Sequence, residues 1–192
     1  MGRHLYRAEN KVEVYAVYDK LFAMFPNNYD LVYPYMRYSV RKKTNELRAA
    51  KIAGAYYEAN KEDMNSRMLN MYASLLLAIG KDDEAMKVYG STFAAKVIED
   101  EKKAAELNGY SWFWAEQGKN LESALKAAKI SLEFKDDPNT WDTLSMVYWK
   151  MGEHEKALEA ENNALQMVGG ERKDYEDRIK AITEDMNKMT NE

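Results

Sequence analysis

Cysteine is absent from this chain of 192 residues, and histidine occurs only as His4 and His154. Without cysteine there is no disulfide, no thiolate metal site and no cysteine nucleophile. The two histidines lie far apart, without metal-ligand spacing, and His154 falls in a predicted turn between helices. We therefore expect no metal and no cofactor.

Residues that favour sheet or break helices are scarce. The chain has 3 prolines and 9 glycines, and its 23 alanines outnumber the 21 Val, Ile and Thr residues combined. This balance favours helix over sheet. No apolar run reaches the roughly 18 residues that a membrane-spanning helix needs, so we expect no membrane insertion.

The amino-terminal residues lack the features of a secretory signal peptide. Positions 1–7 contain neither an apolar core nor a small-residue cleavage site, and charges recur from Glu9 onward. A cytoplasmic location is favoured if Met1 is the native start. A periplasmic or secreted location stays open if the chain is a fragment.

A strong charge of one sign is also missing. The formal net charge is -4 and the pI is near 5.4, so no overall field attracts nucleic acid, and we expect no such partner. Residues 1–60 nevertheless carry 10 Lys and Arg against 6 Asp and Glu. We expect a local basic patch there that orients a peptide with an acidic end. Its residues are Arg37, Arg41, Arg48 and Lys51.

The chain contains none of the common catalytic motifs. It has no Gly-x-Ser-x-Gly, Gly-x-Gly-x-x-Gly, Walker or His-Glu-x-x-His sequence. The step Gly80-Lys81-Asp82 lacks the upstream glycine and the following Ser or Thr of a phosphate loop. Acidic residues are interspersed with Lys and Arg, as on a solvated helix surface. We therefore predict a protein without enzymatic activity.

Three glycines mark an internal repeat. Gly80, Gly118 and Gly152 each end an apolar helical stretch, with spacings of 38 and 34 residues. Each is followed five or six residues later by an alanine that opens a second stretch, namely Ala85, Ala124 and Ala157. A period in this range indicates a stacked array of helix pairs.

The clearest unit of the array spans 138–170. Asp137 can cap its first helix with Pro138 at the first position, and Gly152 can end that helix in the left-handed conformation. The other key positions are Trp141, Leu144, Ser145, Tyr148, Ala157 and Ala164. This pattern resembles the tetratricopeptide repeat (TPR) family, with Glu161 in place of the usual aromatic residue and Gly169 in place of the usual proline.

The resemblance implies an all-α fold, a right-handed superhelix of antiparallel helix hairpins with about ten helices. We treat 1–192 as a single helical-repeat domain. Its predicted parts are an N-terminal helix or half repeat (3–25), a degenerate hairpin (26–60), three repeats (66–103, 104–137 and 138–170) and a C-terminal capping helix (171–189).

Apolar stripes and small residues define the expected packing. The first helix has the stripe Val14, Tyr18, Leu21 and Phe25, and the last has Tyr175, Ile179, Ile182, Met186 and Met189. Pro34 is expected only in the first turn of its helix. Small side chains allow the two helices of each repeat to approach closely; these are Ala73, Ser111 and Ser145, with Ala85, Ala124 and Ala157.

In TPR proteins the first helix of each repeat lines a concave groove that takes a peptide. The resemblance places eight residues along it: Arg67, Asn70, Ser74, Asn108, Trp112, Asp142, Met146 and Trp149. Asparagine suits a peptide backbone because its amide both donates and accepts, and aromatic rings are frequent hot spots. Because successive helical residues lie about 100° apart, Trp112, Phe113 and Trp114 do not all face one interior. Trp112 is left for the groove unless a neighbouring helix covers it.

We expect a non-catalytic protein–protein interaction module that binds a peptide or protein segment in this groove. One alternative is the C-terminal accessory region of a larger, thioredoxin-like enzyme, which the half repeat at the start motivates. Another is a structural scaffold that self-associates and is therefore a homo-oligomer.

Overall fold

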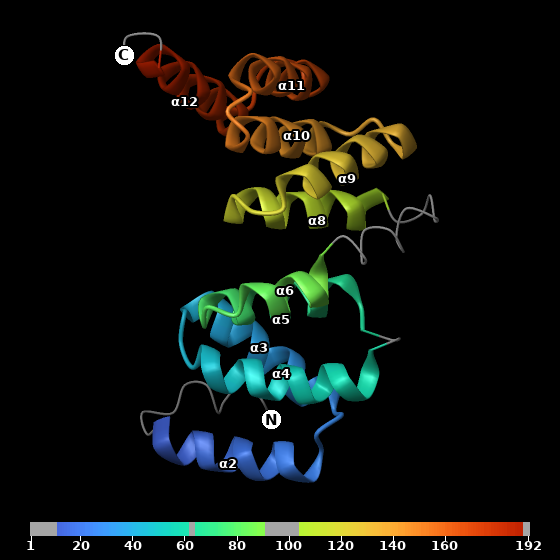
Figure 1. Cartoon of the computed structure of the whole chain (residues 1–192), viewed down its shortest axis with the longest axis vertical. Coiled ribbons are helices and arrows are strands. Elements are labelled where there is room, and N and C mark those ends of the chain that lie inside the picture. Colours follow the sequence, from blue (N-terminus) through green and yellow to red (C-terminus); the bar gives the residue numbers. More distant parts are fainter. Residues whose placement is uncertain (1–10, 62–63, 91–103, 190–192) are drawn as a thin grey trace. The chain divides into compact units, whose positions relative to one another are not determined.

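The computed structural model describes residues 11–61, 64–90 and 104–189, and every regular element within these ranges is an α-helix (Figure 1). The all-α prediction and the expected number of helices are confirmed, since ten helices lie in the described ranges and no strand does. The chain divides into two compact units, Met1–Tyr89 and Gly90–Glu192. Among the described helices, none combines the length and apolar character needed to cross a bilayer.

The first unit contains five described helices. They are α2 (Lys11–Met24), α3 (Tyr29–Lys42), α4 (Glu46–Asn60), α5 (Ser66–Ala78) and α6 (Asp82–Tyr89). Helix α3 packs against α4 and α5, and α5 also packs against α4 and α6. The α5–α6 pair belongs to the repeat predicted at 66–103, whose residues 91–103 lie outside the described ranges, as does His4.

An aromatic cluster joins α2 to α3. The Tyr18, Phe22 and Tyr35 rings are buried, with centroids 5.3 to 5.6 Å apart. Phe25, which was predicted to share the apolar stripe of α2, is instead 47% exposed, and Phe22 takes the buried position. The prediction for Phe25 was wrong because α2 ends at Met24, so Phe25 lies beyond the helical face that meets α3.

Pro34 also departs from expectation. It is the sixth residue of α3 rather than a residue of its first turn. Its missing N–H removes the bond that would reach the carbonyl of Asp30. Asp30 is exposed, so water can bond that carbonyl instead, and α3 continues to Lys42.

The second unit contains α8 (Ala104–Gln117), α9 (Leu121–Phe134), α10 (Pro138–Lys150), α11 (His154–Met167) and α12 (Lys173–Met189). Helix α8 packs on α9, and α10 packs on α8, α9 and α11, so successive helix hairpins stack (Figure 1). Helix α12 packs on α11. The hairpins lie within the repeats predicted at 104–137 and 138–170.

Local signals of the last repeat behave as predicted. Asp137 caps α10 by accepting from the backbone N–H of Asn139 at 3.0 Å, with Pro138 at the helix start. Gly152 follows α10 with φ of 80°, the left-handed conformation that favours glycine. The small residues at the helix contacts, Ala73, Ser111, Ser145, Ala85, Ala124 and Ala157, are all fully buried.

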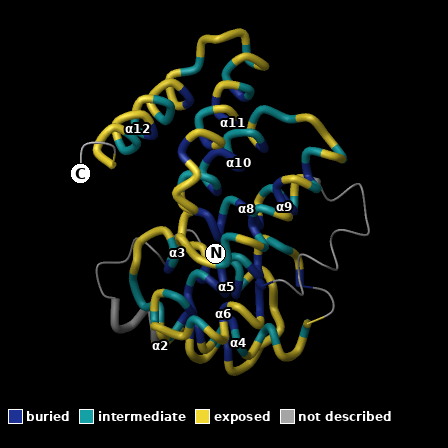
Figure 2. Tube along the Cα trace, turned by 45° about the horizontal axis from the view of Figure 1, so that its top comes forward, coloured by how far each residue is buried: buried dark blue, intermediate teal, exposed yellow. Residues whose placement is uncertain are grey.

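Helix α12 is exposed along most of its length (Figure 2). Of its predicted apolar stripe, Tyr175 and Ile182 are buried, whereas Met189 is 61% exposed. The helix therefore buries few apolar side chains against its unit, and its polar side chains make several of its contacts with the other helices.

Candidate functional site

The eight predicted groove residues fall into two sets in different units. Arg67, Asn70 and Ser74 lie on α5, and the Ser74 hydroxyl donates to the backbone carbonyl of Asn70 at 2.9 Å. Arg67 is exposed, while Asn70 and Ser74 are half-buried. The other five lie on α8 and α10 of the second unit: Asn108, Trp112, Asp142, Met146 and Trp149.

Helix α12 contacts the second set. The Tyr175 hydroxyl donates to Asn139 Oδ1 at 3.4 Å, Arg178 Nε lies 2.8 Å from Asp142 Oδ1, and the Trp149 indole donates to Asp185 Oδ2 at 3.1 Å. In each pair the residues are 36 positions apart. The contact residues follow the same order along α10 and along α12, with the same separation in sequence. Helix α12 therefore runs parallel to α10, and the separation is about the length of one repeat.

Arg178 is at the centre of this contact. Its guanidinium carbon lies 5.4 Å from the centre of the Trp112 ring, and Nη1 lies 3.4 Å from the sulfur of Met146. Its Nε also lies 3.6 Å from Oε2 of Glu161, on α11. Arg178 thus brings together three predicted groove residues, Trp112, Asp142 and Met146, with Glu161. We call these five residues the arginine cluster.

Two carboxyl groups share the interior of this cluster. Glu161 has no exposed surface, and the Asp142 side chain is 15% exposed. Burial, followed by the negative charge of Asp142, raises the pKa of Glu161 to about 8, outweighing the nearby Ser145 hydroxyl and Arg178. Burial likewise raises the pKa of Asp142, against the opposing charge of Arg178. At neutral pH we expect one proton on the acid pair and one guanidinium beside it.

The hydrogen-bond geometry of the cluster is incomplete. In the part of the chain that the structure describes, no well-aligned hydrogen bond reaches Oδ1 of Asp142, either carboxyl oxygen of Glu161, or Nε of Arg178. The 2.8 Å approach of Arg178 to Asp142 is therefore an ion pair that lacks good hydrogen-bond alignment.

A second polar contact lies two turns further along α12. Asp185 Oδ2 accepts from Trp149 and lies 3.3 Å from Nε2 of His154, whose other ring nitrogen lies 2.9 Å from the Gly152 carbonyl. The hydrogen bond from Trp149, and next the contact with His154, lower the pKa of Asp185. Trp149 is half-buried, and the N–H edge of its indole ring faces Asp185.

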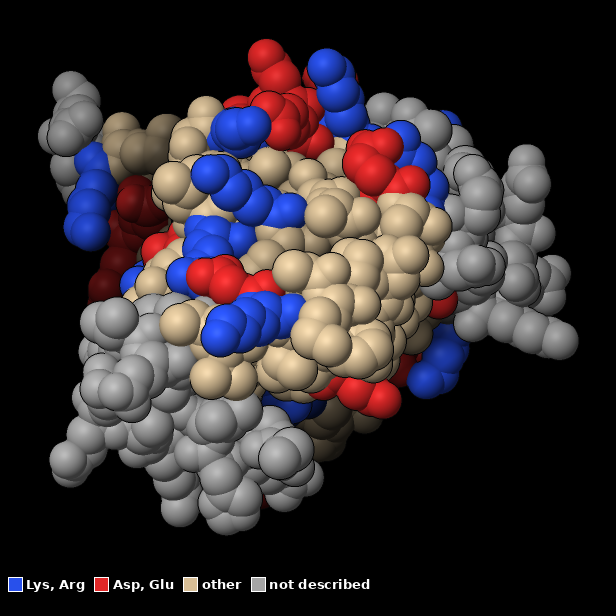
Figure 3. Space-filling model, turned by 90° about the horizontal axis from the view of Figure 1, so that it is seen from below, with Lys and Arg blue, Asp and Glu red and all other residues tan. Residues whose placement is uncertain are grey.

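The remaining predicted residues do not join the arginine cluster. Asn108 lies on α8 one turn before Trp112, half-buried, with no hydrogen bond to Oδ1 from the described residues. In the first unit, Arg37, Arg41 and Lys51 are exposed, while Arg48 pairs with Asp19. On the face seen in Figure 3, basic side chains alternate with acidic and uncharged ones, rather than forming a continuous basic surface.

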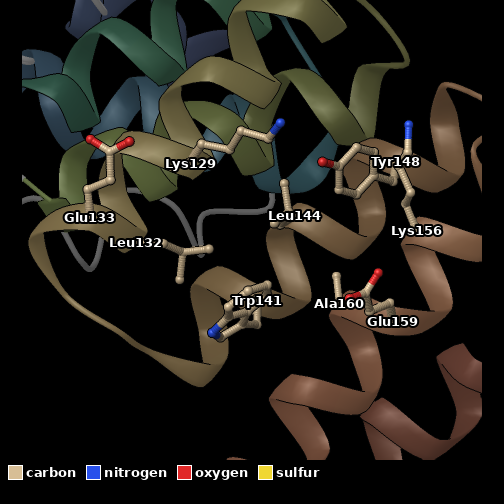
Figure 4. A pocket seen from close by; sticks show the side chains of 9 residues that line it. All are labelled: Lys129, Leu132, Glu133, Trp141, Leu144, Tyr148, Lys156, Glu159 and Ala160. Carbon is tan, nitrogen blue, oxygen red and sulfur yellow. The ribbon is translucent and has the colours of Figure 1, made fainter.

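A different face of α10 lines an open pocket of about 440 Å³ (Figure 4). The Lys129 and Lys156 amines lie 5.7 and 5.8 Å from the centre of the Tyr148 ring. Trp141, Leu144 and Leu132 form much of the apolar wall. None of the predicted groove residues lines this pocket.

Sequence reasoning missed Glu161 and Arg178 as members of a site. Glu161 gave a signal, because a carboxylate stands where the repeat pattern has an aromatic residue facing the interior. Arg178 gave none, because it belongs to a helix with many exposed charges.

No protein-family model matches the chain, and no curated protein matches it significantly. Among the described residues, no group of three or more His, Asp or Glu side chains is arranged to hold a metal ion.

Proposed function

We propose that this chain is a TPR-like, non-catalytic interaction module that binds a peptide or protein segment along α8 and α10. The observation that carries the proposal is that four side chains assigned to the groove, Trp112, Asp142, Met146 and Trp149, already contact one helix, α12. A surface that engages one helix through these residues has the spacing and chemistry to engage another.

The chemistry of these residues supports peptide binding. Trp112 and Trp149 are half-buried rings that present large apolar faces, the side chains that most often dominate protein interfaces. The indole N–H of Trp149 adds a directional hydrogen bond, and the carboxyl of Asp142 adds a charged group. Apolar burial supplies affinity in such an arrangement, and the polar groups fix register.

The proposal is tested with peptides selected from a displayed library against the full chain. Trp112→Ala and Trp149→Ala are each expected to weaken binding by about 2 kcal/mol, or roughly 30-fold. Trp141→Ala is the matched control, because Trp141 lies on the face of α10 that lines the open pocket. Circular dichroism verifies that each variant keeps its helicity.

Selected peptides that bind the folded Trp112→Ala and Trp149→Ala chains as tightly as the wild type would contradict the proposed surface. Failure of the selection to yield any peptide for the wild-type chain would count equally against it. Sedimentation over a concentration series separates a monomeric module from a self-associating scaffold.

A further inference from the structure

Glu161 lies where an ionised side chain is costly. It is fully buried, and neither of its carboxyl oxygens has a well-aligned hydrogen bond within the described residues. A buried carboxyl group of this kind needs a cation or a donor. The nearest cation is Arg178, at 3.6 Å, which comes from α12 rather than from the hairpin that contains Glu161.

The surroundings of the acid pair suit a guanidinium more than an ammonium. Asp142 and Glu161 offer carboxyl oxygens from two helices, and the Trp112 ring offers a face over which the guanidinium already lies. A guanidinium is planar, carries several donors in a fixed fork, stacks on aromatic rings and is weakly hydrated. An ammonium can also lie over an aromatic face, but it is a compact, strongly hydrated charge without the planar fork of donors.

Arg178 occupies this site without saturating it. It approaches Asp142 to 2.8 Å, but its Nε forms no well-aligned hydrogen bond there. A bidentate arginine–carboxylate pair makes two parallel hydrogen bonds and is considerably stronger. Another arginine with a different approach therefore has interaction energy to gain at the same carboxyl groups.

The attachment of α12 permits exchange. Of its 17 residues only Tyr175 and Ile182 are buried, and it packs mainly on α11, while it meets α8 and α10 through single side chains such as Arg178 and Asp185. The helix covers Trp112 and Trp149, which are also the residues most suited to hold a partner.

We propose that Asp142, Glu161 and Trp112 form an arginine-recognition site, that α12 occupies it with Arg178, and that the external partner is an α-helical segment presenting an arginine there. This inference rests on the proposed peptide-binding function and names the chemistry of the peptide.

The register of α12 specifies the partner further. Counting from Arg178, an aromatic residue stands three positions earlier, an apolar one four positions later and an acid seven positions later; these are Tyr175, Ile182 and Asp185. Tyr175 donates to Asn139, Ile182 is buried on the inner face of α12, and Asp185 accepts from Trp149. A partner helix with this pattern, running parallel to α10, makes the same contacts.

The test uses a fluorescent peptide of residues 172–189 and a second peptide with citrulline, the uncharged isostere of arginine, in place of Arg178. The receptor is the full chain carrying Ile182→Asp, which introduces a charge at a buried position and undocks α12. Thr183→Asp is the matched control, because the same charge is added at the exposed neighbouring position.

We expect the arginine peptide to bind the Ile182→Asp chain at least tenfold more tightly than the citrulline peptide does. Adding Asp142→Asn to the receptor should abolish this preference. The Thr183→Asp chain should bind the peptide more weakly, because its own α12 stays in place. If Ile182→Asp costs more helicity than α12 contains, Ile182→Ser, a milder change at the same buried position, serves as receptor and the outcomes have the same meaning.

Equal binding of the two peptides would overturn arginine recognition while leaving peptide binding intact. Absence of binding to a folded, undocked receptor would overturn the inference as a whole. Binding that survives Trp112→Ala unchanged would instead contradict the proposed function, so the two failures are distinguishable.

Discussion

The Arg178 guanidinium lies over the Trp112 ring, 5.4 Å from its centre, and so connects the last described helix of the chain to the first described helix of its unit. Between them, Asp142 of α10 and Glu161 of α11 contribute the carboxyl groups that pair with it. The Arg178 side chain therefore contacts three other helices. A substitution of Arg178 should change both the unfolding free energy and the exposure of α8 and α10 to a partner.

The acid pair should make stability depend on pH. Glu161 has a pKa of about 8 in the folded protein, against an ordinary 4.5. Its contribution to stability is complete below about pH 4.5 and is lost as pH rises towards 8, because only the folded state holds the proton over this range. We expect the unfolding free energy to fall by up to about 1.4 kcal/mol per pH unit there.

Urea denaturation of the wild type and Glu161→Gln at pH values between about 5 and 8 measures this dependence. Glutamine keeps the shape of a protonated glutamate but does not titrate, so its stability curve should be flatter. If the two proteins lose stability in parallel across this range, Glu161 is not the titrating group.

Removal of the cation should destabilise the second unit. Arg178→Gln leaves Asp142 and Glu161 inside the cluster without a positive charge, and we expect a loss on the order of 2 kcal/mol of unfolding free energy. Lys180→Gln on the same helix is the control. Lys180 pairs only with exposed Glu184 among the described residues, and we expect no measurable loss.

The double variant Asp142→Asn/Arg178→Gln should recover part of the loss, because no ionised Asp142 is then left unpaired. Thermal unfolding of the four proteins of this cycle gives the coupling energy. A coupling near zero would show that the close approach of Arg178 to Asp142 contributes nothing to stability.

The repeat could be predicted from sequence because its signals are local. Gly152 has the left-handed conformation that ends α10, Asp137 caps that helix, and Ala124 and Ala157 are fully buried where helices meet. Each of these roles depends on one residue type at one position of a hairpin, so periodic spacing is sufficient to reveal it.

The arginine cluster could not be predicted in the same way, because it depends on where side chains of four helices converge. Arg178 belongs to a helix rich in exposed Lys, Asp and Glu, and nothing in its immediate sequence separates it from those charges. Trp112 and Trp149 were expected at the groove, and both contact α12. The prediction that Phe25 is buried was wrong for a different reason. Because α2 ends at Met24, Phe22 rather than Phe25 reaches the core.

The cap of α10 should matter at acid pH. The capping residue is Asp137, whose carboxylate accepts a hydrogen bond from Lys135 and others from Asn139. These bonds, the one from Lys135 most of all, hold the pKa of Asp137 below the ordinary 3.8. Its charge therefore stabilises the fold above that value, and the contribution is lost as pH falls through the lowered pKa. Asp137→Ala should cost about 1 kcal/mol at neutral pH.

Asp137→Asn separates capping from charge, because asparagine caps helices comparably but does not titrate. Denaturation at neutral pH should show most of the stability retained in Asp137→Asn, and a series down to about pH 3 should show a shallower acid decline. A loss in Asp137→Asn as large as that in Asp137→Ala would mean that the charge, rather than the cap, stabilises α10.

Gly54 provides a test of packing in the first unit. It lies in α4, and a Cβ atom at this position would be 2.8 Å from the hydroxyl of Tyr72, a buried residue of α5. Gly54→Ala should therefore destabilise the protein, even though alanine favours an isolated helix by about 0.5 to 1 kcal/mol. In the Tyr72→Phe background the hydroxyl is gone, and the same change should become stabilising. Gly109→Ala in α8 is the control, because no atom of the described residues lies within 4 Å of its Cβ position, so it should stabilise in either background. Equal effects of Gly54→Ala with and without the Tyr72 hydroxyl in chemical denaturation would show that α4 and α5 do not meet at this point.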